Sequence, residues 1–389
     1  MIKLLYIADF SESYPYRLLK GIMAAMQGRP FSVLRMPTVL MRDRGMDEVV
    51  RIATQAKITA VIGQFEPDDR VDLLVRQGIK VFAQDYISRF TNITNITGSY
   101  AEQGREAANY FLAKGFRSFA FFGYRGAVWS EERFHGFHRR LLECDIPEER
   151  IFCNRNQQLE NQWYYDSDEL AAWLRQLPRS TALFAADDSL ANRVAETSLS
   201  AGIRIPTDLA LIGVDDDDIA CTLTTPQLSS ISLDVYNAGQ KVARSIMRML
   251  VDDLDKTLDI VVRSTGIVER QSSDILATDD PDILRVLSYI NTRLSHRLDM
   301  KELLTVVPMS RRSLEMRFRK ITGLSVHQYI MEHRMQHLAQ RLISSTESIG
   351  NLAMEVGIGD QQNVSRLFQK YYNTTPEKYR GEHRRFIKY

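Results

Sequence analysis

The sequence predicts a chain of 389 residues with two regions: a two-lobed α/β domain built on parallel sheets, followed by a smaller all-helical domain. Three observations support this prediction. Apolar runs alternate with amphipathic stretches over the front region, strand signals stop near Arg270, and a pattern repeats at an offset of about fifty residues in the tail. A chain of this length forms two or three domains, because single hydrophobic cores do not grow to this size.

The front region reads as strand, helix, strand in repeated order. This order is typical of parallel sheets that helices cover on both faces, since right-handed crossovers place a helix over the sheet each time. The stretch is long enough for two such sheets, each with its own core. The expected strands lie at 4–8, 32–36, 60–63, 80–83, 119–123, 182–186 and 209–214, and helical segments at 16–26, 103–113, 132–142 and 191–201.

Polar turn-forming residues between Gln271 and Pro281 mark the boundary between the two regions. We therefore expect the α/β domain over 1–271, a linker over 272–281 and the helical domain over 282–389. Each lobe of the α/β domain is expected to combine two stretches of chain. The first lobe takes about 1–114 and 226–255, and the second takes about 115–225 and 256–271.

Charge is distributed unevenly along the chain, although the net charge is only +1. Residues 282–389 hold 18 Lys and Arg against 10 Asp and Glu, whereas the rest holds 32 against 39. A basic module joined to an acidic one is typical of a protein whose basic module meets a polyanion. The chain start reaches Asp9 too soon for a secretory signal, and no stretch resembles a membrane span. We therefore expect a cytoplasmic protein without a membrane partner.

The repeated pattern in the tail is a helix, a turn and a second helix. Ser310 and Asp360 are expected to be the N-caps of the two second helices, because their side-chain oxygens accept from free backbone N–H groups. One long helix over 326–342 is expected to connect the copies. The tail is thus predicted to form two helix-turn-helix units.

The second helix of each unit presents polar side chains opposite its apolar face. A helix of this kind enters the DNA major groove with its N-terminal turn on the base edges. Arginine pairs best with guanine and glutamine with adenine, so these side chains favour DNA binding over the alternative of a solvated face on an interaction module. The predicted base-reading residues are Arg311, Arg312, Glu315, Arg319, Gln361, Gln362, Ser365 and Arg366, and the predicted phosphate contacts are Lys320, Lys370, Lys378 and Arg380.

Polar residues follow most of the apolar runs in the front region. Open α/β sheets bind ligands beyond the carboxyl ends of their strands. A sugar suits such a set, because carboxylates accept from its hydroxyls, arginine donates to them and an aromatic ring covers the apolar face. A single aspartate would more often be a turn residue or a helix cap. The predicted ligand-binding residues are Asp9, Phe10, Asp85, Trp129, Arg133, Asp187 and Asp215.

Three strings of the second helix-turn-helix unit, at 352–357, 365–370 and 374–380, resemble the AraC-type DNA-binding domain. The resemblance covers nearly the whole tail and implies DNA binding in transcription control. Two positions depart from the family. Met316 stands where an arginine is usual, and Asn363 with Val364 stands where Tyr-Phe is usual. Base preferences therefore do not transfer from relatives.

The front region, from residue 1 to about 270, resembles the effector domain of the lac-repressor family and the related periplasmic sugar-binding proteins. The strings 123–137, 184–188 and 211–216 carry this resemblance. It implies that the residues at four positions touch the sugar, although Asp187 is usually Asn there and Ser99 stands where an Asp is common. The four positions are Asp85, Arg133, Asp187 and Asp215.

Together the two domains resemble the xylose-operon type of activator along the full chain, and the segment 129–133 fits this comparison. The resemblance implies a pentose effector, for which xylose is a candidate, and a homodimer that activates transcription at promoter DNA with RNA polymerase as a partner. Sugar-driven closure of the lobes would reposition the two tails. We expect no cofactor, since glycine-rich phosphate loops are absent from the sequence. We expect no enzymatic activity, since the chain carries a DNA-binding module and no pair of acids can be placed at a scissile bond.

Several alternatives remain open at the level of sequence. The chain could be a transcription repressor with an effector other than a sugar, or a sugar-converting enzyme that uses paired acids. The run 215–218 lacks the alternate spacing of a calcium loop and is interpreted as a turn. His333 and His337 are four residues apart on a helix and are interpreted as ordinary helix-surface residues, not metal ligands.

Overall fold

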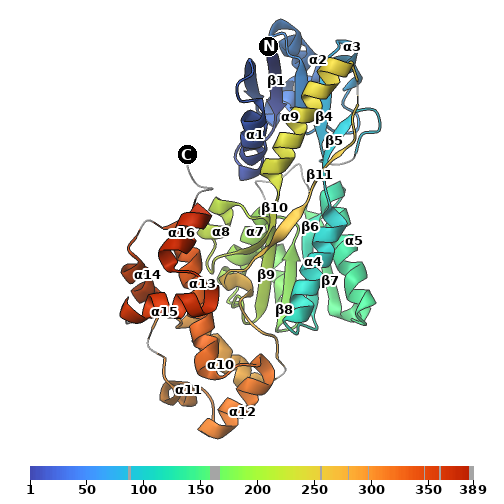
Figure 1. The fold of residues 1–389 in the computed structure, drawn as a ribbon. Helices are drawn as coiled ribbons and strands as arrows, with labels where there is room; N and C mark the ends of the chain where they lie inside the picture. Colours follow the sequence, from blue (N-terminus) through green and yellow to red (C-terminus); the bar gives the residue numbers. More distant parts are fainter. Residues whose placement is uncertain are drawn as a thin grey trace. The chain divides into compact units, whose positions relative to one another are not determined.

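The computed structural model describes residues 1–85, 89–157, 167–254, 256–278, 280–296, 298–345, 347–358 and 361–384. The chain divides into two compact units (Figure 1). Met1–Ala113 and Arg117–Ser273 form the first, and Lys114–Phe116 with the chain from Asp274 onward forms the second. The first unit contains two sheets and the second is helical, so the predicted fold class is confirmed.

The first lobe is built on a six-stranded parallel sheet in the order β11-β5-β4-β3-β1-β2. Its central strands are buried along nearly their whole length, as expected for a sheet covered on both faces. The strands are β1 (Ile2–Ile7), β2 (Phe31–Met36), β3 (Ala60–Gly63), β4 (Lys80–Gln84), β5 (Thr94–Gly98) and β11 (Ile260–Val262), and the helices are α1 (Ser13–Met26), α2 (Thr38–Gln55), α3 (Asp72–Arg76) and α9 (Val235–Asp252).

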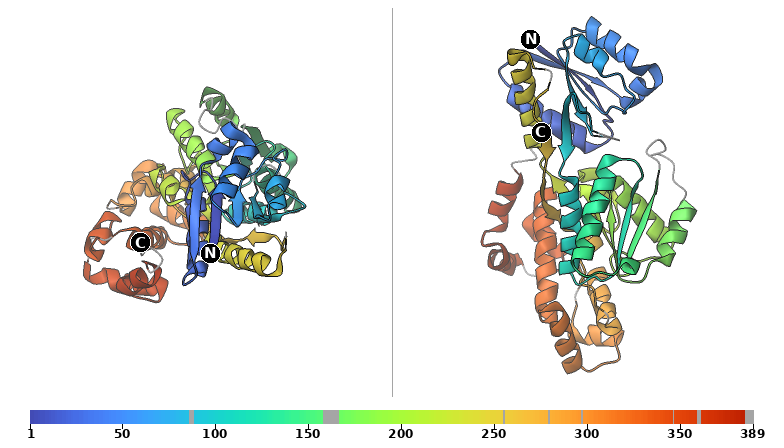
Figure 2. Two further views of the ribbon diagram at one scale, coloured as in Figure 1. Left: turned by 90° about the horizontal axis from the view of Figure 1, so that it is seen from above. Right: turned by 90° about the vertical axis from the view of Figure 1, so that its right-hand side faces the viewer.

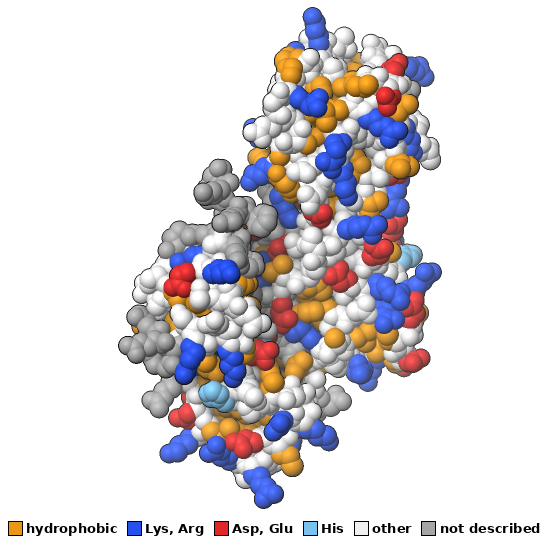
Figure 3. Space-filling view, in the orientation of Figure 1, with side chains coloured by type: hydrophobic (Ala, Val, Ile, Leu, Met, Phe, Trp, Pro, Cys, Tyr) orange, Lys and Arg blue, Asp and Glu red, His pale blue; other side chains and the backbone are white. Residues whose placement is uncertain are grey.

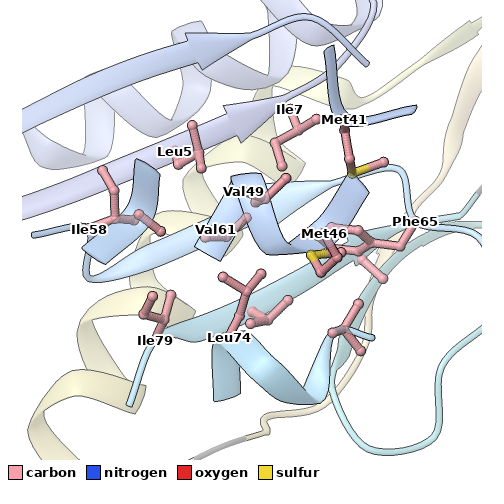
Figure 4. Close-up of a cluster of buried hydrophobic side chains, with 14 of the residues drawn as sticks. Leu5, Ile7, Met41, Met46, Val49, Ile58, Val61, Phe65, Leu74 and Ile79 are labelled. Atoms are coloured by element: carbon pink, nitrogen blue, oxygen red, sulfur yellow. The ribbon is translucent and has the colours of Figure 1, made fainter. Parts of the chain in front are cut away.

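One core of this lobe lies between the sheet and α2 with α3 (Figure 4). Leu5 and Val61 come from the sheet, Val49 from α2 and Leu74 from α3, and all four are buried. Each side chain of this kind stabilises the fold by roughly 1.5–3 kcal/mol when fully buried. The core fixes the strand ends of the lobe in position.

The second lobe has a six-stranded sheet in the order β12-β10-β9-β8-β6-β7, parallel except for β12, which is antiparallel to β10. Its helices cover both faces, with α4 beside α5 in the views of Figures 1 and 2. The strands are β6 (Phe119–Tyr124), β7 (Ile151–Gln157), β8 (Thr181–Ala185), β9 (Leu209–Asp215), β10 (Ser229–Leu233) and β12 (Ser264–Val268), and the helices are α4 (Tyr100–Ala113), α5 (Val128–Glu143), η1 (Glu148–Arg150), α6 (Ser167–Gln176), α7 (Asp188–Ser200), α8 (Asp218–Leu223) and η3 (Gln271–Ser273).

Facing glycines allow α4 and α5 to pack closely. A Cβ on Gly104 would lie 2.0 Å from the backbone oxygen of Arg133, and one on Gly136 would lie 2.0 Å from that of Ala101. Neither position therefore accepts a side chain without moving a helix backbone. The contact attaches α4 firmly to the second lobe and places its first turn beside Arg133.

The chain crosses between the lobes three times, after β5, after β10 and between β11 and β12. The crossing segments are hydrogen-bonded, with Ser99 N donating to Val262 O at 3.1 Å and Asp234 N to Arg263 O at 2.9 Å. Three short connections of this kind form a hinge, because few backbone dihedrals need to change for the lobes to move.

The crossings correct three lobe boundaries expected from the sequence. The segment 100–113 was expected in the first lobe, but as α4 it packs on α5 of the second. Ser229–Leu233 was also expected in the first lobe, but it pairs with β9 in the second sheet. Ile260–Val262 was expected in the second lobe, but it pairs with β5 in the first sheet. Strand pairing partners are remote in the chain, so local patterns did not indicate them.

The helical domain has seven helices within the residues described. Ser310 accepts from Ser313 N as the N-cap of α12, which confirms that cap. The connecting helix begins with a capping box between Ser325 and Gln328. Asp360, the other expected cap, lies outside the described residues. The helices are α10 (Pro281–Thr292), α11 (Met300–Val306), α12 (Arg311–Thr322), α13 (Val326–Ser344), α14 (Ile349–Glu355), α15 (Gln361–Tyr372) and α16 (Pro376–Arg384).

Two separate cores form in this domain, one for each helix-turn-helix unit. Leu314 and Phe318 of α12 are buried in the first, and Val364 and Phe368 of α15 in the second. The long helix α13 contributes to both, with its N-terminal half in the first core and its C-terminal half in the second. Among the described residues, no helix combines the length and apolar character needed to cross a membrane.

The segment expected to be the linker, 272–281, is buried at its start. Ser272 Oγ donates to Leu211 O at 2.6 Å and accepts from Ser229 N at 2.8 Å, so it completes the second lobe. Asp274 belongs to the second unit, where its side chain lies 2.7 Å from His333 Nδ1. The linker therefore does not begin at 272 as expected, because Ser272 is bonded within the second lobe and Asp274 within the helical domain.

Candidate functional site

The predicted sugar-site residues lie where strands of both sheets end, or on α5. Asp9 follows β1, Asp85 directly follows β4, Asp187 follows β8, and Asp215 is the last residue of β9. Tyr14, at the start of α1, lies near enough to Asp85, Asp215 and Arg133 for their charges to act on its pKa, which burial raises strongly. Residues of both lobes therefore converge on one region.

Arg133 is the buried cation of this region, with 4% of its surface exposed. Its Nε donates to Gln103 Oε1 at 2.8 Å, and its Nη1 donates to the backbone oxygen of Ala186 at 2.6 Å. The guanidinium carbon lies 5.2 Å from the ring centre of Tyr100 and 5.4 Å from that of Trp129. Arginine has five N–H donors, so these two bonds leave donors for a ligand. The rings limit its hydration and hold its plane.

Asp85 is a carboxylate with one satisfied oxygen and one unsatisfied oxygen. Oδ2 accepts from Thr97 Oγ1 and from Arg89 Nε, the latter at 3.1 Å. Oδ1 is buried without a hydrogen-bond partner among the described residues. Burial raises the pKa of Asp85 to about 6, although the bond from Thr97 and the charge of Arg89 oppose the shift. A ligand hydroxyl that donates to Oδ1 would satisfy the carboxylate and favour its charged form.

Asp187 and Asp215 bring negative charge from the second lobe. Burial raises the pKa of both, to about 6 for Asp187, and the charge of Arg133 opposes the shift in each case. Both residues are partly exposed, so a ligand can reach them. Asp187 also caps α7 by accepting from Leu190 N at 2.7 Å, so one of its oxygens has a structural role.

The described contacts of Asp9 and Phe10 are with neighbouring residues of the first lobe. The Asp9 carboxylate accepts from Ser11 N at 2.9 Å and from Ser11 Oγ at 2.7 Å, which is the turn role that a lone aspartate often has. The ring of Phe10 packs edge-on against Tyr6 and Tyr16. Asp9 nevertheless belongs to the acidic group around Glu12, where it helps to raise the pKa of that residue.

Four residues of this region were missed at the level of sequence: Glu12, Tyr14, Tyr100 and Gln103. Desolvation by the surrounding protein, followed by the charges of neighbouring aspartates, raises the pKa of Glu12 to about 8, although the residue keeps contact with solvent. Tyr100 and Gln103 lie on the first turn of α4, directly beyond β5. Tyr100 was missed because β5 was not among the expected strands, so no position beyond it was considered. Gln103 carries no sequence signal, and only its bond to Arg133 in the structure identifies it.

Several hydrogen bonds join the lobes near this region. Ser13 N, on the first lobe, donates to Asp217 Oδ2 at 2.9 Å. Arg17 of α1 donates to the backbone oxygens of Asp215 at 2.7 Å and of Leu233 at 2.6 Å. The state described is therefore one in which the lobes contact each other beside the acidic group. A ligand that binds residues of both lobes would stabilise this state.

In the helical domain, the polar face of α12 lies as predicted on the exposed side of the helix. Arg312 and Arg319 are exposed, and Arg311 Nε donates to Glu315 Oε1 at 3.0 Å across one helical turn. Figure 3 shows Lys and Arg side chains around the end of the domain where α11 and α12 lie. Met316, on the same helix, is 66% exposed, so it adds an apolar contact to this face.

The second helix-turn-helix unit presents polar side chains of α15 to solvent. Ser365 and Arg366 are exposed on α15, on the side away from the buried Val364 and Phe368. The side chains of Gln361 and Gln362 lie outside what the structure describes, so their contacts with DNA remain predictions.

His333 and His337 are not helix-surface residues, contrary to expectation. Their side chains are 12% and 18% exposed, and both face Asp274. His333 Nδ1 lies 2.7 Å from Asp274 Oδ2, and Asn291 Nδ2 donates to the backbone oxygen of Asp274 at 2.6 Å. Burial lowers the pKa of His337, which the charge of Asp274 opposes. The cluster attaches the chain that enters the domain to α13.

Comparisons with known families agree with this two-domain organisation. Residues 108–273 match the periplasmic binding protein-like domain, and residues 303–382 match a helix-turn-helix domain. The xylose operon regulatory protein of Escherichia coli K12 is 28% identical over 270 residues, which cover 69% of this chain and 68% of that protein.

Two further comparisons cover the tail and the whole chain. The multiple antibiotic resistance protein MarA of Escherichia coli K12 is 35% identical over 103 residues, which are 26% of this chain and 81% of MarA. The solved structure described as the xylose-binding transcription activator xylR has a TM-score of 0.74 at 22% identity and covers 98% of both chains. The order of the two folds along the chain is therefore that of a known structure.

Proposed function

Because the chain belongs to the AraC-type transcription regulators, with a periplasmic-binding-protein-like domain in front of its helix-turn-helix domain, we propose that it activates transcription in response to a pentose. D-Xylose is the first candidate. The observation that carries this choice is the relative named as a xylose operon regulatory protein, which matches the chain over 270 residues. The chemistry of the converging side chains supports a sugar independently.

The site supplies what a neutral sugar needs. Asp85 Oδ1 is an acceptor without a partner among the described residues, and Arg133 keeps unused donors. Asp187 and Asp215 provide further acceptors, and the ring of Trp129 borders the guanidinium. The surplus of carboxylates over arginines disfavours phosphorylated or acidic sugars, since like charges repel in a partly desolvated site. The proposed effector is therefore a free, uncharged sugar.

The proposed mechanism is ligand-gated activation in the cytoplasm. Sugar contacts residues of both lobes and so favours the closed state, with the three crossings between the sheets acting as the hinge. Two chains pair as a homodimer, and closure changes the placement of the two helix-turn-helix domains on promoter DNA. The activated complex then recruits RNA polymerase.

Isothermal titration of the full chain against D-xylose, L-arabinose, D-ribose and D-glucose tests the effector. We expect heat with at least one pentose and tighter binding of D-xylose than of D-glucose. Absence of heat with every sugar would refute the sugar assignment and favour a regulator with another effector. Product formed from the bound sugar, measured by chromatography, would identify an enzyme instead.

A further inference from the structure

Arg89 connects the candidate ligand carboxylate with the opposite lobe. Its Nε donates to Asp85 Oδ2 at 3.1 Å and to Thr97 Oγ1 at 3.0 Å, both in the first lobe. Its Nη1 and Nη2 donate to Glu132 Oε1 at 2.7 Å and Oε2 at 2.9 Å, which is a bidentate pair with α5 of the second lobe. One guanidinium therefore bonds to two carboxylates on two lobes.

The first set of bonds fixes the orientation of the Asp85 carboxylate. Thr97 and Arg89 both bond to Oδ2, and the Asp85 side chain is fully buried. The carboxylate is thereby turned so that only Oδ1 is left without a partner among the described residues. Without Arg89, the buried charge would lose the cation that pairs with it, and the carboxylate would be free to rotate toward Thr97 with either oxygen.

The second set of bonds depends on lobe closure. Glu132 lies on α5 of the second lobe and Arg89 follows β4 of the first, so the pair forms only when the two lobes approach each other. Both partners are about one-third exposed, so solvent screens the pair. Pairs of this kind shift an equilibrium by about two- to fivefold. The contact can bias the lobes toward closure without locking them, which leaves room for a ligand to act.

We propose that Arg89 is a positioning residue for the effector, which orients Asp85 for the sugar and couples this orientation to lobe closure through Glu132. The inference rests on the proposed function for the identity of the ligand, and on geometry alone for the coupling. Arg89 touches neither the sugar acceptor Oδ1 nor Arg133 in the bonds described. Its effect on affinity is therefore indirect.

The test combines sugar affinity with lobe distance in the full chain. D-Xylose is titrated calorimetrically into the wild type, Arg89→Leu, Glu132→Gln and the double variant. We expect affinity to fall about tenfold or more in Arg89→Leu and two- to fivefold in Glu132→Gln. The double variant should be no weaker than Arg89→Leu alone, because both hydrogen bonds of Glu132 across the lobes go to Arg89. Independent, additive losses would overturn the coupling.

Lobe closure is read without sugar from spin-label distances between the two lobes. We expect Arg89→Leu and Glu132→Gln to populate longer distances between the lobes than the wild type. Unchanged distances in both variants would refute the role of the Arg89–Glu132 pair in lobe closure, whether or not D-xylose binds. Arg204→Leu is the matched control, because Arg204 pairs with Asp208 at 2.8 Å inside the second lobe alone. It should change neither quantity. If the wild type binds no sugar, the proposed function fails, while the distance measurement still tests the effect of the Arg89–Glu132 pair on lobe closure.

Discussion

Arg133 carries its charge inside the protein, and its partners decide what its replacement does. In Arg133→Ala, Gln103 and the Ala186 carbonyl lose their donor, and Asp187 and Asp215 lose the cation that lowers their pKa. We expect sugar affinity to fall by about a hundredfold or more, since an unpaired buried charge partner costs several kcal/mol. Basal DNA binding should persist, because the helical domain has its own cores.

Calorimetry and gel-shift titration of the same preparation measure the two effects of Arg133→Ala separately. The matched control is Arg125→Ala, which removes an exposed arginine from the loop before α5 and should leave both affinities unchanged. Wild-type sugar affinity in Arg133→Ala would refute the assignment of Arg133 to the site.

Asp85 gives sugar binding a pH dependence whose sign follows from its raised pKa. The proposed contact needs the deprotonated carboxylate, whose pKa burial raises to about 6. Sugar affinity should therefore be highest at a pH above the pKa of Asp85. It should fall by about tenfold for each pH unit below that pKa. Asp187, whose pKa is also raised to about 6, adds to the loss.

Titrations at pH 5, 6 and 7.5 measure this dependence. We expect Asp85→Asn to bind D-xylose more weakly at pH 7.5 and to keep only the share of the pH dependence that Asp187 supplies. An affinity that does not change between pH 5 and 7.5 in the wild type would contradict the assignment of both aspartates.

At the residue scale, strand-end positions were predictable and pairings were not. Asp85, Asp187 and Asp215 followed from the rule that parallel strands place their carboxyl ends at one edge. The same rule could not indicate that the carboxylate of Asp188, the next residue after Asp187, accepts hydrogen bonds from Ser230 Oγ at 2.6 Å and Asp217 N at 2.9 Å. Nor could it indicate that Arg89 bridges to Glu132, which lies 43 residues further along the chain. Such roles depend on partners that are distant in sequence.

At the scale of single elements, α12 is the helix whose exposed face carries the predicted DNA contacts. Arg312→Ala should weaken binding to the preferred promoter about tenfold or more and relax discrimination at one guanine, because a bidentate arginine contact contributes roughly 1–3 kcal/mol. Lys320→Ala should weaken binding to all sequences similarly and reduce the dependence of log affinity on log salt by about one. Gel shifts with base-substituted probes at several salt concentrations distinguish the two.

The outcome that would contradict the prediction for α12 is a uniform loss in Arg312→Ala across all probes. Thr305→Ala is a control outside the polar face of α12, since this residue lies on α11 and its hydroxyl bonds to the helix carbonyl of Glu302 at 2.7 Å. It should leave both the affinity and the salt dependence close to those of the wild type.

Element types were easier to predict than element partners. The helical period of 103–113 indicated a helix, and the structure has one as α4. Its lobe was wrong because the decisive contact, Gly104 against the Arg133 backbone, joins helices that are about thirty residues apart. The two helix-turn-helix units were predictable, since each is a local pattern with its own apolar pair. Local elements can be predicted from sequence patterns, whereas sheet order and helix pairing are predicted only weakly.

At the scale of the whole molecule, sugar binding must be communicated to the DNA-binding domain. Asp274 directly follows the last residue of the effector domain and bonds to His333 on α13, the helix that both helix-turn-helix cores share. We expect Asp274→Asn to keep sugar affinity and DNA affinity within a few-fold of the wild type but to lose most of the sugar-dependent increase in transcription. Glu347→Gln, at an exposed position of the same domain, should retain the full response.

Transcription in vitro with and without D-xylose measures the response, and calorimetry and gel shifts measure the two affinities. A wild-type activation ratio in Asp274→Asn would show that the signal does not pass through this attachment. A large loss of DNA affinity without sugar would instead assign Asp274 a role in folding of the domain.

The whole chain also makes a prediction about its operator. The two reading helices differ: α12 begins with Arg311 and Arg312, whereas α15 begins with Gln361 and Gln362. Arginine prefers guanine and glutamine prefers adenine, and two helices of one domain that enter successive major grooves are separated by about one helical turn, roughly 10.5 base pairs. Each half-site should therefore hold a guanine-bearing and an adenine-bearing segment at that spacing, and a dimer should protect two half-sites.

Footprinting of promoter DNA with the purified full chain, with and without D-xylose, measures the spacing and the effect of sugar together. Sugar should extend protection from one half-site to both, because closure is proposed to place both tails for simultaneous contact. In Arg133→Ala the footprint should stay the same with and without sugar. Protection of two half-sites in the absence of sugar, unchanged by its addition, would mean that sugar acts after DNA binding, at the step of polymerase recruitment.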